Sequence, residues 1–230
     1  PVMIRQIKRY MADHEMEKPW TPPTMEAKKG QKVAVVGSGP AGLTAALRLA
    51  QWGYDVTVHE ALPVAGGMMA VGIPEYRLPK DILNMEIDNI RRAGVEIKLN
   101  TRVDKAMFDR IKKDYDAVYV ATGADKGWTL GIPGEDLDGI YDAITFLKDV
   151  NLEKNTIQVG EKVAVVGGGN SAIDAARTAL RKGAKKVTIV YRRLKADMPA
   201  APEEIHEAEM EGIEIRYLAV PTEAIGENGK

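Results

Sequence analysis

The six-residue sequence Lys-Val-Ala-Val-Val-Gly occurs twice in this chain, first from Lys32 and again from Lys162. After each copy come a glycine-containing turn, an alanine-rich segment with helical spacing, a further glycine and another run of β-branched residues. Chance readily produces one short glycine motif, but a strand, a turn and a helix repeated in the same order indicate duplication. The sequence therefore predicts two α/β units of the same design.

Short β-branched runs alternate with helical segments from residue 32 onward, which is typical of a parallel sheet flanked by helices. We expect strands at residues 33–36, 55–60, 95–99, 117–121 and 214–220, and helices at residues 2–14, 41–52 and 81–92. Residues 61–79 are rich in glycine and proline and are expected to form a loop. The predicted organisation is an amino-terminal helix and linker over 1–30, a first Rossmann-like unit over 31–125 and a second over 126–230, with both units incomplete.

A glycine-rich turn follows the first predicted strand and opens the next helix. Its residues are Gly37, Ser38, Gly39, Pro40, Ala41 and Gly42. In a dinucleotide fingerprint, the glycine at position 37 permits the tight turn, Gly39 lets the backbone approach a pyrophosphate, and Gly42 allows close packing of helix on strand. Glu60 ends the second strand, where a carboxylate can accept hydrogen bonds from both ribose hydroxyls. The alternative is a turn selected for packing alone, with Glu60 an ordinary solvated charge.

A second glycine-rich turn lies at the equivalent place in the second unit. Its residues are Gly167, Gly168, Gly169, Asn170, Ser171 and Ala172. Ala172 stands where the first copy has Gly42, and the rest of the pattern predicts a second phosphate-binding turn at a helix amino terminus.

The residues after the second strand differ between the two units. When these strands are aligned with one residue inserted in the second copy, Tyr191 stands opposite Glu60 and is followed by Arg192 and Arg193. A carboxylate would repel a 2′-phosphate, whereas guanidinium groups bind it through charge-assisted hydrogen bonds. The second site is therefore predicted to prefer NADP over NAD. A solvated basic face, formed together with nearby lysines, is the alternative.

Several further motifs carry a resemblance to a known family. They are GGMMAVGIPEYRLP at residues 66–79, ATGA at 121–124, IPGE at 132–135, and YRR at 191–193 followed by MPA at 198–200. With these motifs the chain resembles, over nearly its whole length, the small (beta) subunit of glutamate synthase. Relatives are the NADP-binding subunit of electron-bifurcating ferredoxin:NADP oxidoreductase and the amino-terminal half of dihydropyrimidine dehydrogenase. The resemblance implies a disulfide-reductase-like flavoprotein with two dinucleotide-binding domains, FAD in the first and NADPH in the second.

The same resemblance implies site residues and a function. Gly66, Gly67 and Met68 would lie against the flavin, Arg77 would contact FAD, Val103 would meet the adenine through its backbone, and Ala121, Thr122 and Gly123 would pass near the cofactor. Core filling by the methionine and surface placement of the arginine are the alternatives. The implied function is electron input: a hydride passes from NADPH to FAD, and electrons then pass to iron–sulfur clusters. Because cofactors carry this chemistry, no catalytic side chain is predicted.

The composition sets limits on partners. The chain has no cysteine, so it can form no disulfide, redox dithiol or thiolate-bound cluster, and clusters are expected only in a partner subunit or a missing domain. The family's cysteine-rich segment and its carboxyl-terminal Gly-Asp motif have no counterpart here, which predicts a fragment that lacks its carboxyl-terminal part and holds FAD weakly. The formal charge of -1 argues against nucleic acid. With no apolar run of about twenty residues, a cytoplasmic protein without membrane contact is expected.

Other classes of protein share parts of this plan. A reductase of the thioredoxin-reductase type needs a cysteine pair, and a flavin monooxygenase needs oxygen-activating features for which the sequence offers no candidate. A non-catalytic dinucleotide-binding module or redox sensor is the alternative from a different class. The three histidines are scattered, and the glutamates around His206 (Glu203, Glu204, Glu207 and Glu209) are expected to form a solvated helix face, so no metal site is predicted.

Overall fold

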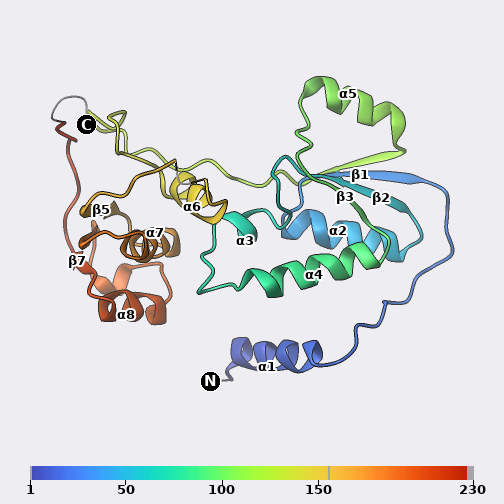
Figure 1. Ribbon diagram of the computed structural model, residues 1–230, viewed down its shortest axis with the longest axis horizontal. Coiled ribbons are helices and arrows are strands. Elements are labelled where there is room, and N and C mark those ends of the chain that lie inside the picture. The colour runs from blue at the N-terminus through green and yellow to red at the C-terminus, as the bar shows by residue number, and fades with distance from the viewer. Residues whose placement is uncertain (1, 155, 227–230) are drawn as a thin grey trace. The chain divides into compact units, whose positions relative to one another are not determined.

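A computed structural model describes residues 2–154 and 156–226. The chain divides into two compact units, shown in Figure 1. Unit 1 comprises Pro1–Ala65 and Asn84–Thr122, and unit 2 comprises Gly66–Leu83 and Gly123–Lys230. Two α/β units were predicted, but the boundary differs: the segment 66–83 belongs to unit 2 and interrupts the unit expected over 31–125. Its packing against helices of unit 2, described below, explains the difference.

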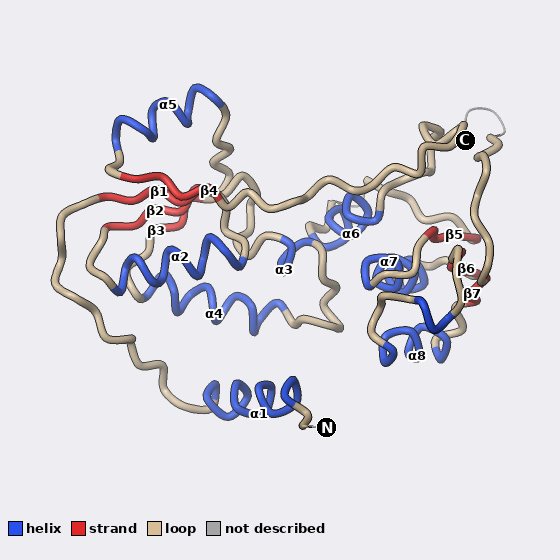
Figure 2. The backbone as a smooth tube through the Cα atoms, turned by 180° about the vertical axis from the view of Figure 1, so that it is seen from behind, coloured by secondary structure: helices blue, strands red, loops and turns tan. Residues whose placement is uncertain are grey.

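Unit 1 contains a four-stranded parallel sheet. Its strands are β1 (Lys32–Val36), β2 (Asp55–His59), β3 (Glu96–Lys98) and β4 (Ala117–Val120), in the order β3-β2-β1-β4. Helices α2 (Pro40–Gln51) and α4 (Lys80–Arg92) cover one face, and α5 (Lys105–Asp114) lies over the other (Figure 2). Buried valines of the strands pack on the alanines of α2, as Val35 and Val58 do around Ala46. The apolar runs of the sequence thus form the interior of the sheet.

The amino-terminal segment of unit 1 is less packed. Helix α1 (Ile4–Met16) buries none of its residues, although apolar side chains recur along it at helical spacing. The linker that follows is held on the unit, because Glu26 N donates to Gln51 O over 2.8 Å and Lys29 N donates to Gly53 O over 2.9 Å. The predicted helix over 2–14 is confirmed with a shift of two residues.

Unit 2 contains a three-stranded parallel sheet of β5 (Lys162–Val166), β6 (Lys186–Val190) and β7 (Glu214–Arg216), in the order β5-β6-β7. Its helices are α3 (Met68–Val71), α6 (Ala143–Asn151), α7 (Asn170–Arg181) and α8 (Pro202–Met210), with a 3₁₀ turn η1 at Lys195–Asp197. Leu147 of α6, Ile173 of α7 and Ile189 of β6 are buried in one core. Among the described residues, no helix is both long and apolar enough to cross a lipid bilayer.

Most strand predictions are confirmed to within two residues, and the exception has a local cause. The strand expected over 214–220 ends at Arg216, because Leu218 takes a φ of 54°. Extended backbone requires a negative φ, so the strand cannot continue through this residue. The loop expected over 61–79 also contains the short helix α3.

Candidate functional site

The first glycine-rich turn is held tightly between β1, α2 and the end of β4. Gly37 has a φ of 104°, and a Cβ there would lie 2.3 Å from the carbonyl oxygen of Ala121. A Cβ on Gly42 would lie 2.0 Å from the carbonyl oxygen of Gly37. By contrast, nothing lies within 4 Å of a Cβ on Gly39, so this position faces open space. Two of the glycines are therefore required by packing, and the third leaves room for a ligand to approach the backbone.

Both glycine-rich turns lead into helices that lack a side-chain cap. The N-cap residue is Gly39 for α2 and Gly169 for α7, and neither helix receives a hydrogen bond from a capping side chain. Pro40, at the first turn of α2, has no N–H to satisfy. Helix amino termini of this kind present backbone amides and a partial positive charge, which suit a phosphate group.

Glu60 is buried directly after β2, with 6% of its surface exposed. Its Oε2 accepts hydrogen bonds from Ser38 N over 2.9 Å and from Ser38 Oγ over 2.5 Å, while its Oε1 accepts from Leu62 N over 2.8 Å. A carboxylate can accept about four hydrogen bonds. The carboxylate is thus fixed beside the turn with capacity for a further donor, which fits the hydroxyl of a ribose.

The second turn repeats this arrangement with different side chains. Gly167 has a φ of 140°, and a Cβ there would lie 3.3 Å from the Cβ of Ala172, the residue that stands where unit 1 has Gly42. A Cβ on Gly168 would lie 2.5 Å from the ring of Tyr191, whereas a Cβ on Gly169 would meet only Pro199, at 3.9 Å. As in unit 1, the third glycine of the turn is the least crowded of the three.

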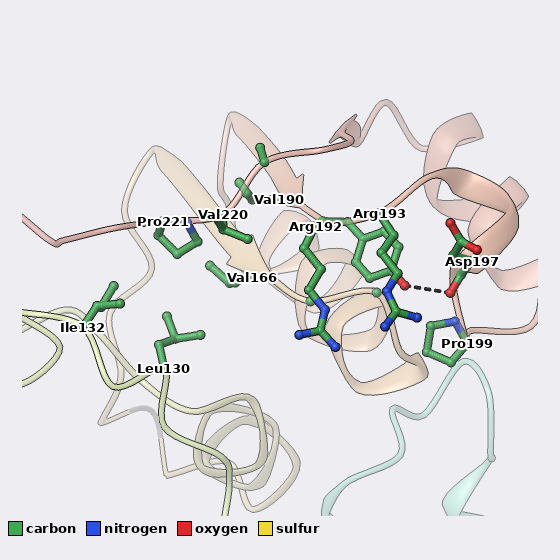
Figure 3. Close-up of a pocket in the computed structure, with 14 residues that line it drawn as sticks. Leu130, Ile132, Val166, Val190, Arg192, Arg193, Asp197, Pro199, Val220 and Pro221 are labelled. Carbon is green, nitrogen blue, oxygen red and sulfur yellow. Dashed lines mark hydrogen bonds between the residues drawn. The ribbon is translucent and has the colours of Figure 1, made fainter.

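A pocket of about 560 Å³ lies beside the second turn (Figure 3). Arg192 and Arg193 project side by side on one part of its wall, with Asp197 near them. Within the part of the chain that the structure describes, neither guanidinium forms an ion pair, and both residues are exposed. The other part of the wall is apolar and consists of Leu130, Ile132, Val166, Val190, Val220 and Pro221. The pocket thus offers two unpaired cations next to an apolar surface.

The repeat extends beyond the region that sequence comparison identified. Asn100 in unit 1 and Leu218 in unit 2 take φ values of 52° and 54° at the same place after the third strand. In the next residue, Thr101 N donates to Glu60 O over 2.7 Å, and Ala219 N donates to the equivalent Tyr191 O over 3.1 Å. By this register Val103 corresponds to Pro221, which lines the pocket. The segment 218–221 was missed, because its sequence shares nothing obvious with residues 100–103.

The Gly-Gly segment of the long loop lies in unit 2. Gly66 and Gly67 have φ values of 114° and 56°, and Gly67 is the N-cap of α3. Lys80 Nζ donates to the carbonyl oxygens of Met69 over 3.0 Å and Ile73 over 2.5 Å, and burial lowers the pKa of this lysine. Asn151 Nδ2 donates to Val71 O over 2.9 Å. Side-chain donors therefore fix the backbone of this loop on its own unit.

Arg77 has partners other than those expected from the resemblance. Its Nη1 lies 2.6 Å from Asp174 Oδ2 and its Nε lies 3.1 Å from Glu204 Oε1. Contact between Arg77 and FAD stays a prediction, and so do the flavin contacts of residues 66–68. Val103 and Ala121 are partly exposed, while Thr122 and Gly123 are exposed.

The prediction of a solvated face on α8 is wrong for one of its glutamates. Glu204 is not part of a solvated face: it pairs with Arg177, whose side chain is only 5% exposed, over 2.8 Å. Arg177 also pairs with Glu207 and Glu211, and its guanidinium lies 4.5 Å from the centre of the Tyr76 ring. No group of metal-ligating side chains occurs among the residues described, and His59 is buried against Tyr115.

The sequence of this chain is similar to those of known oxidoreductases. Residues 31–230 match the family model described as pyridine nucleotide-disulphide oxidoreductase. The beta subunit of an NADP(+)-dependent formate dehydrogenase from Moorella thermoacetica is 46% identical over 254 residues, which cover 100% of this chain and 36% of that protein. The small chain of NADPH-dependent glutamate synthase from Escherichia coli K12 is 36% identical, covering 96% of this chain and 49% of its own length. The chain therefore spans between about a third and a half of these relatives.

Solved structures share the fold of both units. Mycobacterium tuberculosis FprA in complex with NADPH has a TM-score of 0.73 at 24% identity and covers 86% of this chain and 61% of its own. Thioredoxin reductase from Lactococcus lactis has a TM-score of 0.62 at 26% identity and covers 87% of this chain and 68% of its own. The predicted fold class, two tandem dinucleotide-binding α/β units with parallel sheets, is confirmed.

Proposed function

Because this chain belongs to the pyridine nucleotide-disulphide oxidoreductase family, we propose that it is the electron-input part of an NADPH-dependent flavoprotein. In this proposal FAD binds at the turn of unit 1 and NADPH at the turn of unit 2. The observation that carries it is the exchange at one equivalent position: a buried Glu60 beside the first turn, and Tyr191 followed by two unpaired arginines beside the second. A carboxylate suits free ribose hydroxyls, and a guanidinium pair suits a 2′-phosphate.

In unit 1, the residues proposed to hold FAD fit the cofactor's parts. The turn 37–42 would hold the pyrophosphate at the open space beside Gly39, and Glu60 would accept from the ribose. Val103 would pass along the adenine, and residues 121–123 would pass near the cofactor at the end of β4. Residues 66–68 are proposed to contact the flavin, because two glycines allow close approach of the backbone to a planar ring. An FAD contact of Arg77 is the least supported of these roles, since its Nη1 and Nε already pair with carboxylates of unit 2.

At the second turn, residues 167–172 would hold the NADPH pyrophosphate, and Arg192 with Arg193 would bind the 2′-phosphate. The apolar part of the pocket is a surface of suitable chemistry for the adenine. When bound, NADPH and FAD supply the hydride donor and acceptor. The residues of the chain bind and orient the two cofactors, so no side chain is assigned an acid, base or nucleophile role.

We further propose that electrons leave through clusters on another polypeptide or another part of the same protein. The chain has no cysteine to ligate a cluster. The relatives named above are subunits or chains of larger enzymes, and their lengths exceed that of this chain by about twofold or more. A partner carrying iron–sulfur clusters therefore accounts for the absence of an electron outlet here.

The nucleotide assignment is tested by calorimetric titration with NADP and with NAD. The wild type is compared with the double variant Arg192→Ala/Arg193→Ala. Two charge-assisted contacts contribute about 3 kcal/mol together, so we expect about a hundredfold loss of NADP affinity with NAD affinity unchanged. The variant Lys185→Ala/Lys186→Ala removes the same charge elsewhere on unit 2 and is expected to bind both nucleotides as the wild type does. If the wild type and the double arginine variant bind NADP and NAD equally well, the assignment is wrong.

The redox role needs a separate measurement. Reduction of added FAD by NADPH is followed at the flavin absorbance band, with one of the longer relatives named above as positive control. Electron input predicts bleaching that depends on NADPH and is lost with Arg192→Ala/Arg193→Ala. If NADP binds tightly but this chain does not reduce FAD while the relative does, a dinucleotide-binding module without redox function is the better description.

A further inference from the structure

Tyr191 occupies the position that Glu60 has in unit 1, yet it carries no charge to pair with a phosphate, and its hydroxyl already donates to the carbonyl oxygen of Asp197. We propose that Tyr191 is a specificity-positioning residue: it fixes the segment that presents Arg192 and Arg193 and so sets the preference for a 2′-phosphate. The inference rests on the proposed binding of NADPH to unit 2. The residue would act through the arginines, not by touching the phosphate.

The ring of Tyr191 makes the first of the contacts that fix this segment. It is buried, with 7% of the residue exposed, and it belongs to the core of unit 2. It lies so close to Gly168 that a Cβ on that glycine would approach Tyr191 Cε2 to 2.5 Å. The phosphate-binding turn and the start of the arginine segment are thus in direct contact.

The hydroxyl of Tyr191 makes the second contact. Tyr191 Oη donates to the carbonyl oxygen of Asp197 over 2.7 Å, the bond drawn as a dashed line in Figure 3. Leu194 N donates to Asp197 Oδ2 over 3.2 Å, and Asp197 N donates to Leu194 O over 3.0 Å. Because the hydroxyl joins residue 191 to residue 197, Arg192 and Arg193 lie inside a short loop that is closed at both ends.

The same segment is supported from the side of β7. Tyr191 N donates to Arg216 O over 2.9 Å, and Tyr191 O accepts from Ala219 N over 3.1 Å. Arg193 O accepts from Leu218 N over 3.3 Å. The main chain of residues 191–193 is therefore fixed on one side by backbone bonds, while the Tyr191 hydroxyl supplies the bond on the other.

Unit 1 provides the internal comparison. There the residue after the second strand also contacts the middle residue of the turn, since Glu60 accepts two hydrogen bonds from Ser38. In unit 1 that residue carries the carboxylate itself, whereas in unit 2 it carries a ring and a hydroxyl that fix its neighbours. Arginine side chains lose much rotamer freedom when they bind, so a main chain fixed beforehand lowers the entropy lost on binding a phosphate.

The test removes only the hydroxyl. The variant Tyr191→Phe keeps the ring next to Gly168. The affinities of this variant for NADP, NAD, 2′,5′-ADP and 5′-AMP are measured by calorimetry. We expect binding of NADP and of 2′,5′-ADP to weaken about threefold to tenfold, the effect of one lost hydrogen bond. The affinities for NAD and 5′-AMP should stay within about twofold of wild type, by the same arithmetic. Tyr217→Phe is the matched control, because this buried hydroxyl on the same unit has no hydrogen-bond partner among the described residues.

Hydrogen exchange gives a second readout that does not depend on a ligand. In Tyr191→Phe the amides of Leu194 and Asp197 should exchange faster, while those of Ala172 and Ile173 in α7 should not change. Equal losses for all four ligands, or unchanged exchange and unchanged affinity, would overturn the positioning role. If instead the wild type itself fails to prefer NADP over NAD, the proposed NADPH site fails, and the two failures are thereby distinguished.

Discussion

Arg77 Nη1 donates to Asp174 Oδ2 over 2.6 Å and so joins residues that are 97 positions apart in the sequence. Asp174 lies one turn inside α7, the helix that begins at the second phosphate-binding turn. Its side chain is 5% exposed, and burial raises the pKa of this carboxyl although the Arg77 guanidinium opposes the shift. The pair thus fixes the Gly-Gly loop to the helix proposed to bind the NADPH phosphates.

Replacing Arg77 by methionine should therefore destabilise unit 2. The change leaves Asp174 buried without its cation, and we expect a loss of about 2 to 3 kcal/mol, below the figure for a fully buried pair because Arg77 is 23% exposed. Urea denaturation followed by circular dichroism measures the loss. Lys186→Met breaks an exposed pair with Glu214 on the same unit and should cost less than about 0.5 kcal/mol. Equal stabilities of the two variants would contradict the structural role of Arg77.

The two turns should respond differently to a methyl group at their last position. Gly42→Ala places a Cβ 2.0 Å from a backbone oxygen that cannot move away, so we expect a loss of about 3 kcal/mol or more. The reciprocal change Ala172→Gly relieves no clash and should cost only about 1 kcal/mol of helix propensity. Thermal unfolding of both variants checks the difference. A Gly42→Ala protein as stable as Ala172→Gly would mean that α2 does not approach Gly37 this closely.

The Ser38–Glu60 pair of unit 1 should also fit at the equivalent positions, 168 and 191, of unit 2. Gly168→Ser alone introduces a Cβ 2.5 Å from the Tyr191 ring and should destabilise the unit by about 2 kcal/mol. Adding Tyr191→Glu removes the clashing ring and recreates the Ser38–Glu60 hydrogen bonds, so part of the lost stability should recover, although the core packing of the ring and its bond to Asp197 O are lost. The double variant should also lose its preference for NADP, because a carboxylate now faces the 2′-phosphate. Thermal unfolding and calorimetry measure the two effects, and a double variant less stable than Gly168→Ser would show that the turns are not equivalent.

Acid should destabilise unit 2 through Glu211. Hydrogen bonds from Arg181 and Arg177 hold its pKa at about 2, below the ordinary 4.5. A depressed pKa means that the folded protein binds the proton less readily than the unfolded chain. The stabilisation is therefore present above about pH 4.5 and is lost as the pH falls toward 2. Urea denaturation at several pH values should show this acid loss in the wild type and a shallower one in Glu211→Gln, which is already less stable at pH 7. Parallel pH profiles would contradict this role.

Local features were predictable because they depend on neighbours in the sequence. The turn at Gly37 needs a positive φ and the one at Gly167 does too, and both occur where a glycine follows a β-branched strand. The equivalence of Tyr191 and Glu60 followed from strand alignment and agrees with the register, in which Val190 lies opposite Val166 as His59 lies opposite Val36. Glu204 was misjudged as solvated, because no local pattern reveals that Arg77 and Arg177 reach it.

The duplicated strand, turn and helix can be recognised in the bare sequence, and so can the exchange of an acid for an aromatic residue and two arginines, since these are properties of short segments. How deeply identical segments are buried depends instead on the packing of the whole unit. The residues Lys-Val-Ala-Val-Val form both β1 and β5, yet all four residues after the lysine are buried in β1 and none is in β5. β1 pairs with β2 on one edge and β4 on the other, whereas β5 pairs with β6 alone among the described strands. Burial depends on what packs against a strand, and that is supplied by residues distant in the chain.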